Sequence, residues 1–281
     1  MRIIRAEHAG FCYGVRRAAR LAAEAAGCKD RPVYTLGPLM HNPQEVARLA
    51  AQGIQPRERI EDCVGGRTLV RTHGVAREVF QRARELGIEL VDATCPRVKV
   101  PHGWIERLGR EGRHVVILGD AGHPEVRALQ SYACGPVTLV ERPDRLPDLP
   151  PGTPLGLVAQ TTQTKEAFSR LESALRARFA DLVAHNTICL DSEQRQQEGR
   201  QLAACADVVL VVGGRNSANT NRLTHICRAV QPRTHHLESV REIEGVDLNG
   251  AEVVVVASGA STPDWIIDEL ESRLQKSLKN R

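Results

Sequence analysis

The sequence predicts an α/β protein built from three similar domains, each a small, mostly parallel sheet with flanking helices. Short runs rich in Val, Ile and Leu alternate with longer amphipathic segments, a pattern typical of parallel strands covered by helices. The 281 residues are 42% hydrophobic but only 3% aromatic, so aliphatic side chains must fill the core. Two kinds of strand–loop–helix segment also recur three times each.

The first recurring segment is an apolar strand that ends at glycine, followed by a polar loop and a helix. Its strands and helices are expected at residues 32–37 and 44–51, at 114–119 and from 126 onward, and at 207–214 and 222–230. Parallel strands joined by helices make right-handed crossovers, which bring such loops to the sheet edge where ligands bind. The loops carry His41, His123 and Ser217.

The second recurring segment has the same plan but a different loop. Its strands and helices are expected at residues 68–71 and 78–86, at 155–159 and 165–179, and at 252–257 and 264–274. The loops carry His73, Thr161 and Ser261, and they should lie at the same sheet edge as the first set.

A third strand in each domain leads to a cysteine. The stretches Ile88–Cys95 and Leu182–Cys189 are apolar strands that end in a Thr-Cys pair or in Thr-x-Cys, and Arg2–Cys12 is a looser copy. The N-terminal copy supplies the strand that is missing after the last segment, so the repeat is circularly permuted. The predicted domains are 13–95, 96–189, and 190–281 plus 1–12. Many α/β proteins look repetitive, but the shared Thr–Cys ending favours a true repeat.

Charge and hydropathy narrow the class of protein. The net charge of +4 indicates a mild preference for anions or simply a solvated surface. The N-terminus lacks the apolar core of a signal peptide, and no segment reaches the length of a membrane helix. We therefore expect a cytoplasmic protein with reduced thiols that does not act at a membrane. No helix-turn-helix pattern or basic arm points to nucleic acid.

Cys12, Cys95 and Cys189 are expected to gather at a central point between the domains. Thiolates at strand ends hold zinc or an iron–sulfur cluster, and the short C-x₂₋₄-C spacing of structural zinc sites is absent. Three distant cysteines fit a cubane cluster with one iron that lacks a protein ligand. A single cysteine is more often a small buried hydrophobe. We interpret the other five that way: Cys28, Cys63, Cys134, Cys205 and Cys227. Of these, Cys205 and Cys227 are expected on the apolar faces of helices.

The polar loops suit a diphosphate. They contain three histidines and several neutral donors, namely His41, Asn42, His73, His123, Ser217, Asn219 and Ser261. Loops of small residues before helices expose backbone N–H groups to an anion. A lone histidine here would more often be a cap or a turn residue. The chain has no G-x-x-x-x-G-K-[ST] motif, so the sequence does not support ATP hydrolysis.

Glu125 and Thr161 each allow two interpretations. Glu125 follows His123 closely and could be an ordinary first-turn residue of a helix or a proton donor near a cluster. Thr161 and its neighbour Thr162 could cap the next helix or orient a substrate hydroxyl.

A series of short motifs runs through the whole chain. They are Gly10-Phe11-Cys12-Tyr13-Gly14-Val15, His41-Asn42, Thr72-His73-Gly74-Val75, Asp92-Ala93-Thr94-Cys95-Pro96, Gly122-His123-Pro124-Glu125-Val126, Gln160-Thr161-Thr162, Thr187-Ile188-Cys189, Arg195-Gln196, Asn216-Ser217-x-Asn219-x-Asn221-Arg222-Leu223 and Gly259-Ala260-Ser261-Thr262-Pro263. With these motifs the chain resembles the LytB family of 4-hydroxy-3-methylbut-2-enyl diphosphate reductases. This family completes the methylerythritol phosphate route to isoprenoids.

The resemblance implies a trefoil of three α/β domains around a [4Fe–4S] cluster held by Cys12, Cys95 and Cys189. It implies catalysis by Glu125, Thr161 and His123, with the substrate hydroxyl on the fourth iron. It assigns the diphosphate to His41, His73, His123, Ser217, Asn219 and Ser261. Removal of the hydroxyl as water would give isopentenyl or dimethylallyl diphosphate. Ferredoxin or flavodoxin is the expected electron donor.

Two positions depart from the family pattern. Ala218 stands where the family usually has serine, and Asp191 adds a negative charge two residues after Cys189. That charge could lower the potential of the cluster, disfavour an anionic substrate, or serve only as a helix cap. Two other functions therefore remain open: a diverged paralogue that reduces another small hydroxylated anion, and a non-catalytic iron–sulfur redox sensor.

Overall fold

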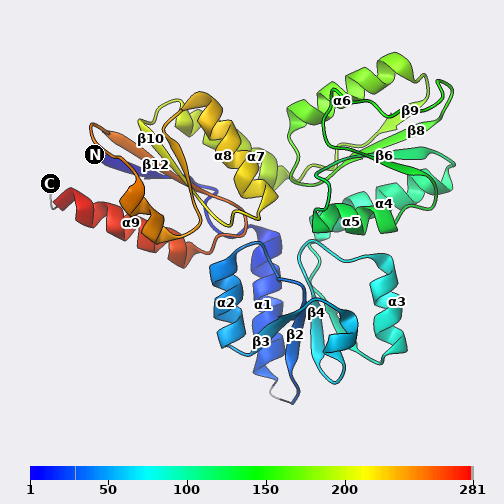
Figure 1. Cartoon of the computed structure of the whole chain (residues 1–281), viewed down its shortest axis with the longest axis horizontal. Coiled ribbons are helices and arrows are strands. Elements are labelled where there is room, and N and C mark those ends of the chain that lie inside the picture. The colour runs from blue at the N-terminus through cyan, green and yellow to red at the C-terminus, as the bar shows by residue number, and fades with distance from the viewer. Residues whose placement is uncertain (29, 280–281) are drawn as a thin grey trace. The chain divides into compact units, whose positions relative to one another are not determined.

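Three small parallel sheets with flanking helices form the protein (Figure 1). The computed structural model describes residues 1–28 and 30–279. Within these residues, twelve strands form three four-stranded sheets, and every strand pairing in them is parallel. Residue 29 of the predicted first domain and residues 280–281 of the third lie outside the described residues. The architecture confirms the α/β class.

The first sheet has the strand order β3-β2-β4-β5. Its strands and the elements around them are α1 (Tyr13–Gly27), β2 (Val33–Leu36), α2 (Pro43–Ala51), β3 (Ile54–Arg57), the 3₁₀ helix η1 (Ile60–Cys63), β4 (Arg67–Val70), α3 (Arg77–Glu85) and β5 (Glu89–Asp92). Leu36 and Val70 pack with Ala83 of α3 in one apolar cluster. Gly87, at φ 67°, ends α3 in the left-handed conformation that glycine adopts without strain.

The second sheet has the order β7-β6-β8-β9. Its elements are α4 (Pro96–Arg110), β6 (His114–Leu118), α5 (Pro124–Ser131), β7 (Val137–Val140), β8 (Leu155–Ala159), α6 (Lys165–Arg178) and β9 (Leu182–Ala184). Alternate residues of β6 face opposite sides: Val116 packs with Phe168 of α6, whereas Val115 packs with Ile105 of α4. Helices therefore cover both faces (Figure 1), which explains the unbroken apolar runs in the sequence.

The third sheet has the order β1-β12-β10-β11. Its elements are β1 (Arg2–Arg5), α7 (Leu190–Ala203), β10 (Val208–Val212), α8 (Ala218–Val230), β11 (Thr234–Leu237), the 3₁₀ helix η2 (Val240–Gly245), β12 (Val253–Ser258) and α9 (Asp264–Lys279). Leu210 packs with Ile267 of α9 on one face, and Val211 packs with Leu223 of α8 on the other. Each fully buried aliphatic side chain contributes about 1.5–3 kcal/mol.

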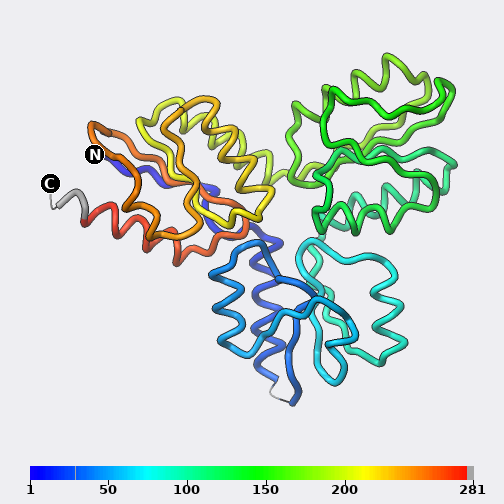
Figure 2. Tube along the Cα trace, viewed as in Figure 1, coloured from blue at the N-terminus to red at the C-terminus, as the bar shows by residue number. Residues whose placement is uncertain are grey.

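The three sheets share one topology, and the third copy is circularly permuted. In the first two copies, the strand that is second in the chain lies at an edge, followed by the first, the third and the fourth. In the third copy, β11, β10 and β12 take the first three places and the N-terminal β1 takes the last. Figure 2 shows this blue N-terminal segment beside the orange segment that contains β12, where Arg2 pairs with Val253. The permuted repeat predicted from the sequence is confirmed in the strand order.

The elements group into two compact units. Unit 1 comprises Met1–Arg16, Met40–Arg48 and Leu190–Arg281, and unit 2 comprises Arg17–Leu39 and Leu49–Cys189. The third sheet lies in unit 1, and the first two sheets lie in unit 2. None of the helices in the described part of the chain has the length and apolar character needed to cross a membrane.

Several elements differ from the sequence prediction. The edge strands β3, β7 and β11 were not predicted, because β3 and β11 are mostly polar and β7 is a short run directly after Gly135-Pro136. Strand β9 ends at Ala184 and β5 at Asp92, so the cysteines follow in loops, and Pro96 opens a helix. Helix α8 begins at Ala218 rather than residue 222, since Ser217 caps it.

Candidate active site

Each of the three predicted cysteine ligands stands directly before a helix. Cys12 precedes α1, Cys95 precedes α4 and Cys189 precedes α7. A helix N-terminus carries partial positive charge from its unpaired N–H groups and favours negative charge beside it. All three side chains are partly buried. The structure therefore gives all three predicted ligands the same setting.

The backbone of each cysteine is fixed in the same way. The amide of Cys12 donates to the carbonyl of Ala260 in unit 1 (3.0 Å). In unit 2, the amide of Cys95 donates to Thr72 (3.0 Å) and that of Cys189 to Thr161 (2.9 Å). Each acceptor lies in the loop after the strand that pairs with the cysteine's own strand. The three copies therefore hold a thiol in one equivalent position, and three such thiols fit the ligand set of an iron–sulfur cluster.

The other five cysteines divide into two groups. Cys63 and Cys227 are buried in apolar clusters, as predicted. Burial raises the pKa of Cys227 to about 11, so its thiol stays protonated. The remaining three, Cys28, Cys134 and Cys205, are exposed, so their interpretation as buried hydrophobes was wrong. The prediction of a helical apolar face was wrong for Cys205, which lies beyond the last residue of α7.

Side chains cap the helix that follows the first strand in every copy. The Oδ1 of Asn42 accepts from the amide of Glu45 (2.9 Å), and the Oγ of Ser217 accepts from the amide of Thr220 (3.3 Å). In the second copy, the Nδ1 of His123 accepts from the amide of Glu125 (3.1 Å). His123 is thus a cap, as the simpler interpretation expected. The cap also fixes its tautomer, because an accepting Nδ1 leaves the proton on Nε2.

The same reasoning assigns the other histidine of unit 2. The hydroxyl of Thr72 donates its one proton to the carbonyl of Leu39 (3.0 Å), so it can only accept from the Nδ1 of His73 (3.3 Å). The rings of His73 and His123 meet edge to face, with centroids 5.5 Å apart. Unit 2 therefore places two predicted substrate-binding residues, His73 and His123, next to each other. The ring nitrogen that carries the proton is assigned in both.

Glu125 and Thr161 form the most specific polar contact in unit 2. Glu125 is 1% exposed, and its carboxylate accepts from both the amide (2.6 Å) and the hydroxyl (2.8 Å) of Thr161. A buried carboxylate needs such donors, because desolvation otherwise disfavours the charge. Thr161 does not cap α6, since Thr164 does so through its hydroxyl (3.1 Å to the amide of Ala167). Thr161 thus connects Glu125 to the backbone of Cys189.

Unit 1 gathers the neutral donors. The hydroxyl of Ser261 donates to the carbonyl of His41 (3.0 Å), which joins two of the predicted loops. Asn219, in the first turn of α8, is buried, and its Nδ2 has no hydrogen-bond partner among the described residues. A buried donor without a partner costs about 1–3 kcal/mol of stability, so this position suits a ligand that supplies an acceptor. Gly259 approaches Thr220 so closely that any side chain there would clash.

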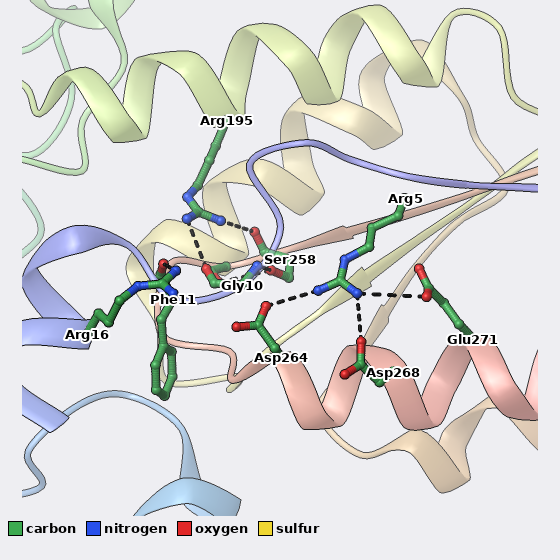
Figure 3. A network of polar contacts seen from close by, with 10 residues as sticks. Arg5, Gly10, Phe11, Arg16, Arg195, Ser258, Asp264, Asp268 and Glu271 are labelled. Carbon is green, nitrogen blue, oxygen red and sulfur yellow. Dashed lines mark hydrogen bonds and ion pairs between the residues drawn. The ribbon is translucent and has the colours of Figure 1, made fainter. Parts of the chain in front are cut away.

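Of the two departures from the family pattern, Asp191 has a local explanation and Ala218 has none. Asp191 pairs with Arg195 one turn along α7 (Oδ1 to Nε, 2.7 Å), so its charge is balanced by a neighbouring cation. Arg195 is 4% exposed and reaches the carbonyls of Gly10 and Ser258 (Figure 3). Ala218 is the first residue of α8, directly after the cap Ser217.

Comparison with known proteins matches this chain to a family over nearly its full length. The family model described as "LytB protein" covers residues 3–275. The chain belongs to the LytB family. It is 44% identical to a 4-hydroxy-3-methylbut-2-enyl diphosphate reductase of Geobacter sp. (strain M21), over 100% of this chain and 99% of that protein. It is also 44% identical to the enzyme of the same name from Anaeromyxobacter sp. (strain K), over 96% and 97%.

Solved structures support the same family. One is described as (E)-4-hydroxy-3-methyl-but-2-enyl diphosphate reductase, the terminal enzyme of the non-mevalonate pathway. It is 39% identical, has a TM-score of 0.71, and the match covers 98% of this chain and 100% of that one. The reductase of Plasmodium falciparum has a TM-score of 0.91 at 23% identity, with 97% and 87% coverage, and shows the shared fold.

Sequence reasoning missed the role of Arg195 and the part played by Ser258. Arg195 was noted only as part of a motif. Its four-residue spacing from Asp191 is the signal that predicts an ion pair along a helix. Nothing local to Ser258 marks it, because its partner Gly10 is 248 residues away in the chain.

Proposed function

We propose that this LytB-family oxidoreductase converts 4-hydroxy-3-methylbut-2-enyl diphosphate to isopentenyl and dimethylallyl diphosphate, as the terminal reductase of the non-mevalonate route. The overall reaction takes up two electrons and two protons and releases the hydroxyl as water. The observation that carries the proposal is the equivalence of Cys12, Cys95 and Cys189. Each has its amide bonded to the neighbouring loop and its thiol before a helix.

The proposed cofactor is a [4Fe–4S] cluster with Cys12, Cys95 and Cys189 as ligands. When bound, it would supply the electrons and a Lewis-acidic iron without a protein ligand for the substrate hydroxyl. The donor set supports this group, because three thiolates can each bind one iron and leave the fourth iron without a protein ligand. Ferredoxin or flavodoxin is the proposed reductant.

Glu125 and Thr161 are the proposed proton path. The Thr161 hydroxyl contacts the carboxyl group of Glu125 (2.8 Å) and has a lone pair left for a further hydrogen bond. When Glu125 is protonated, it can donate to the Thr161 oxygen while the Thr161 hydroxyl passes its own proton to the substrate oxygen, which leaves as water. His123, whose Nε2 carries its proton, is proposed to donate beside them.

The diphosphate is proposed to bind neutral donors and helix N-termini. The assigned residues are His41, His73, His123, Ser217, Asn219 and Ser261. The buried Nδ2 of Asn219, unpaired within the described residues, is the strongest support for an oxygen acceptor at α8. The three-domain division at 13–95, 96–189 and 190–281 plus 1–12 stays a prediction, as does a cytoplasmic location.

One experiment tests the activity. The protein is reconstituted anaerobically with iron and sulfide, its visible absorption is recorded, and it is supplied with the allylic diphosphate and a reduced donor. We expect a cluster spectrum and both diphosphate products. A cluster without turnover would favour a diverged paralogue or a redox sensor, and no cluster would overturn the proposal.

A further inference from the structure

We propose that Arg195 is a positioning residue that sets the place of Cys12 by clamping the loop before it. The inference rests on the proposed function for the role of Cys12 as a ligand. Its structural part, that Arg195 orders residues 7–12, stands on contacts within unit 1 alone.

The guanidinium of Arg195 is shared among three acceptors. Its Nη2 donates to the carbonyl of Gly10 (2.9 Å) and its Nη1 to that of Ser258 (3.4 Å). Its Nε donates to Asp191 (2.7 Å). Figure 3 shows Arg195 extending from α7 toward the loop, with Gly10 and Ser258 beneath its tip. A planar fork with donors in fixed directions can satisfy all three at once, whereas lysine offers a single point of charge.

The loop is tied to the same place by further bonds. The amide of Gly10 donates to the hydroxyl of Ser258 (2.8 Å), and the amide of Cys12 donates to Ala260 (3.0 Å). Gly10 has φ 103°, and a side chain at this position would collide with the carboxylate of Asp264. The backbone at Gly10 is therefore held by Arg195 and Ser258 and has no room to move toward Asp264.

Helix α7 grips the loop at a second point. The carboxylate of Glu198 accepts from the amides of Glu7 and His8 and contacts the Nδ1 of His8 (2.8 Å). Arg195 and Glu198 are three residues apart and so lie on one face of α7. Arg195 donates to a carbonyl and Glu198 accepts from two amides, so both acceptors and donors of the backbone before Cys12 are held.

The ion pair explains why a buried arginine is tolerated here. Asp191 balances the charge of Arg195, which would otherwise be costly at 4% exposure. Helix α7 begins at Leu190, the residue after Cys189 in the chain. One helix thus follows one proposed ligand directly and orders the loop that carries another.

The test compares Arg195→Met and Arg195→Lys with Arg228→Met. Arg228 is a matched control, because it lies in unit 1 and also donates to a backbone carbonyl, that of Thr234 (3.0 Å). The first measurement is amide hydrogen exchange of the full chain without a cluster. We expect exchange in residues 7–12 to rise at least tenfold in Arg195→Met, less in Arg195→Lys and not in Arg228→Met, while β10 keeps its protection.

The second measurement uses the reconstituted protein. We expect the Arg195→Met cluster to be lost several times faster to an iron chelator, and its reduced-state electron paramagnetic resonance spectrum to change. If wild type takes up no cluster, the proposed function fails, but the exchange data still judge the clamp. Unchanged exchange, or a uniform rise across unit 1, would overturn the clamp. Unchanged cluster lifetime and spectrum would overturn its role at Cys12.

A milder variant covers a failure of Arg195→Met to fold. Ser258→Ala removes the acceptor of the Gly10 amide but keeps the carbonyl that Arg195 contacts. Faster exchange limited to residues 7–12 would support the clamp, and wild-type exchange would contradict it.

Discussion

The N-termini of α5 and α8 occupy the same place in two copies of one topology but carry different chemistry. Both are capped from the side chain, by His123 and by Ser217. Two residues after the cap, the second copy has Glu125 and the third has Asn219. Both side chains are buried. Glu125 accepts two hydrogen bonds, whereas the Nδ2 of Asn219 has no partner within the described chain.

The facing loop accounts for the difference. The carbonyl that receives the cysteine amide belongs to Thr161 in the second copy and to Ala260 in the third. Thr161 adds a hydroxyl, which allows a carboxylate to be buried beside it. Ala260 adds none, so a charged group would lack its donor there. One fold position is therefore proposed to serve proton transfer in one copy and anion binding in the other.

The largest expected effect tests the equivalence of the copies. Replacement of Cys12, Cys95 or Cys189 by serine should abolish turnover and most of the cluster absorbance, because each thiol is proposed to provide one of three protein ligands. Iron content and the visible spectrum measure this directly. Cys134→Ser is the control and should keep both, since Cys134 is exposed. If one of the three variants kept a stable, active cluster, the copies would not be equivalent.

Glu125→Gln makes the second copy resemble the third. We expect kcat to fall roughly 10²- to 10⁴-fold, because an amide cannot exchange the proton, while the cluster spectrum stays unchanged. Steady-state kinetics with the reduced donor measure the loss. A variant with full activity would remove Glu125 from the proton path.

Asn219 should affect binding more than chemistry. In Asn219→Ala, loss of one donor to a charged oxygen should raise KM roughly 10- to 100-fold with little change in kcat. Asn219→Asp should raise it further, because it repels the diphosphate. If kcat fell and KM did not change, Asn219 would belong with Glu125 rather than with the anion site.

The smallest effect concerns the helices after the cysteines. Seven residues after its cysteine, α4 has His102 and α7 has Gln196, and both are buried. Burial lowers the pKa of His102 from 6.5 to about 4, while the charge of Asp92 raises it and that of Lys99 lowers it by smaller amounts. As the pH falls, His102 is therefore protonated in the unfolded chain before it is protonated in the folded one. The free energy of unfolding should fall as pH drops from 6.5 toward 4, by roughly 2 kcal/mol at pH 5.

His102→Phe tests this pH dependence, because it keeps an aromatic ring against Tyr132 (centroids 4.2 Å apart in the native pair). Between pH 7.5 and 5, its thermal midpoint should fall less than that of the wild type. Equal slopes would mean that other groups cause the acid sensitivity.

The sequence was most informative where one residue type had one physical purpose. Unbroken aliphatic runs predicted β6, β8, β10 and β12, because strands covered on both faces need them. The Thr–Cys endings predicted equivalent positions for Cys95 and Cys189. It was less informative for β3 and β11, whose polar residues suit an edge that only tertiary pairing creates.

Within the candidate site, the sequence predicted which residues belong to it but not what each side chain contacts in the fold. The pattern selected Glu125 and Thr161, yet Glu125 could have been an ordinary first-turn residue and Thr161 a helix cap. Only the fold brings Thr161 to both oxygens of Glu125 across 36 residues and leaves capping to Thr164. Arg195 shows the same limit, because its acceptors Gly10 and Ser258 are distant in sequence.

The pairing of β1 with β12 has a consequence for biosynthesis. Arg2 is synthesised long before its partner Val253. Strand β1 must therefore wait, unpaired with β12, until Val253 has emerged from the ribosome, and contacts of such long sequence separation form slowly. The loop of Cys12 depends on Ser258 and Ala260 in the same way. Insertion of a metal group that uses Cys12 would then be a step that follows synthesis.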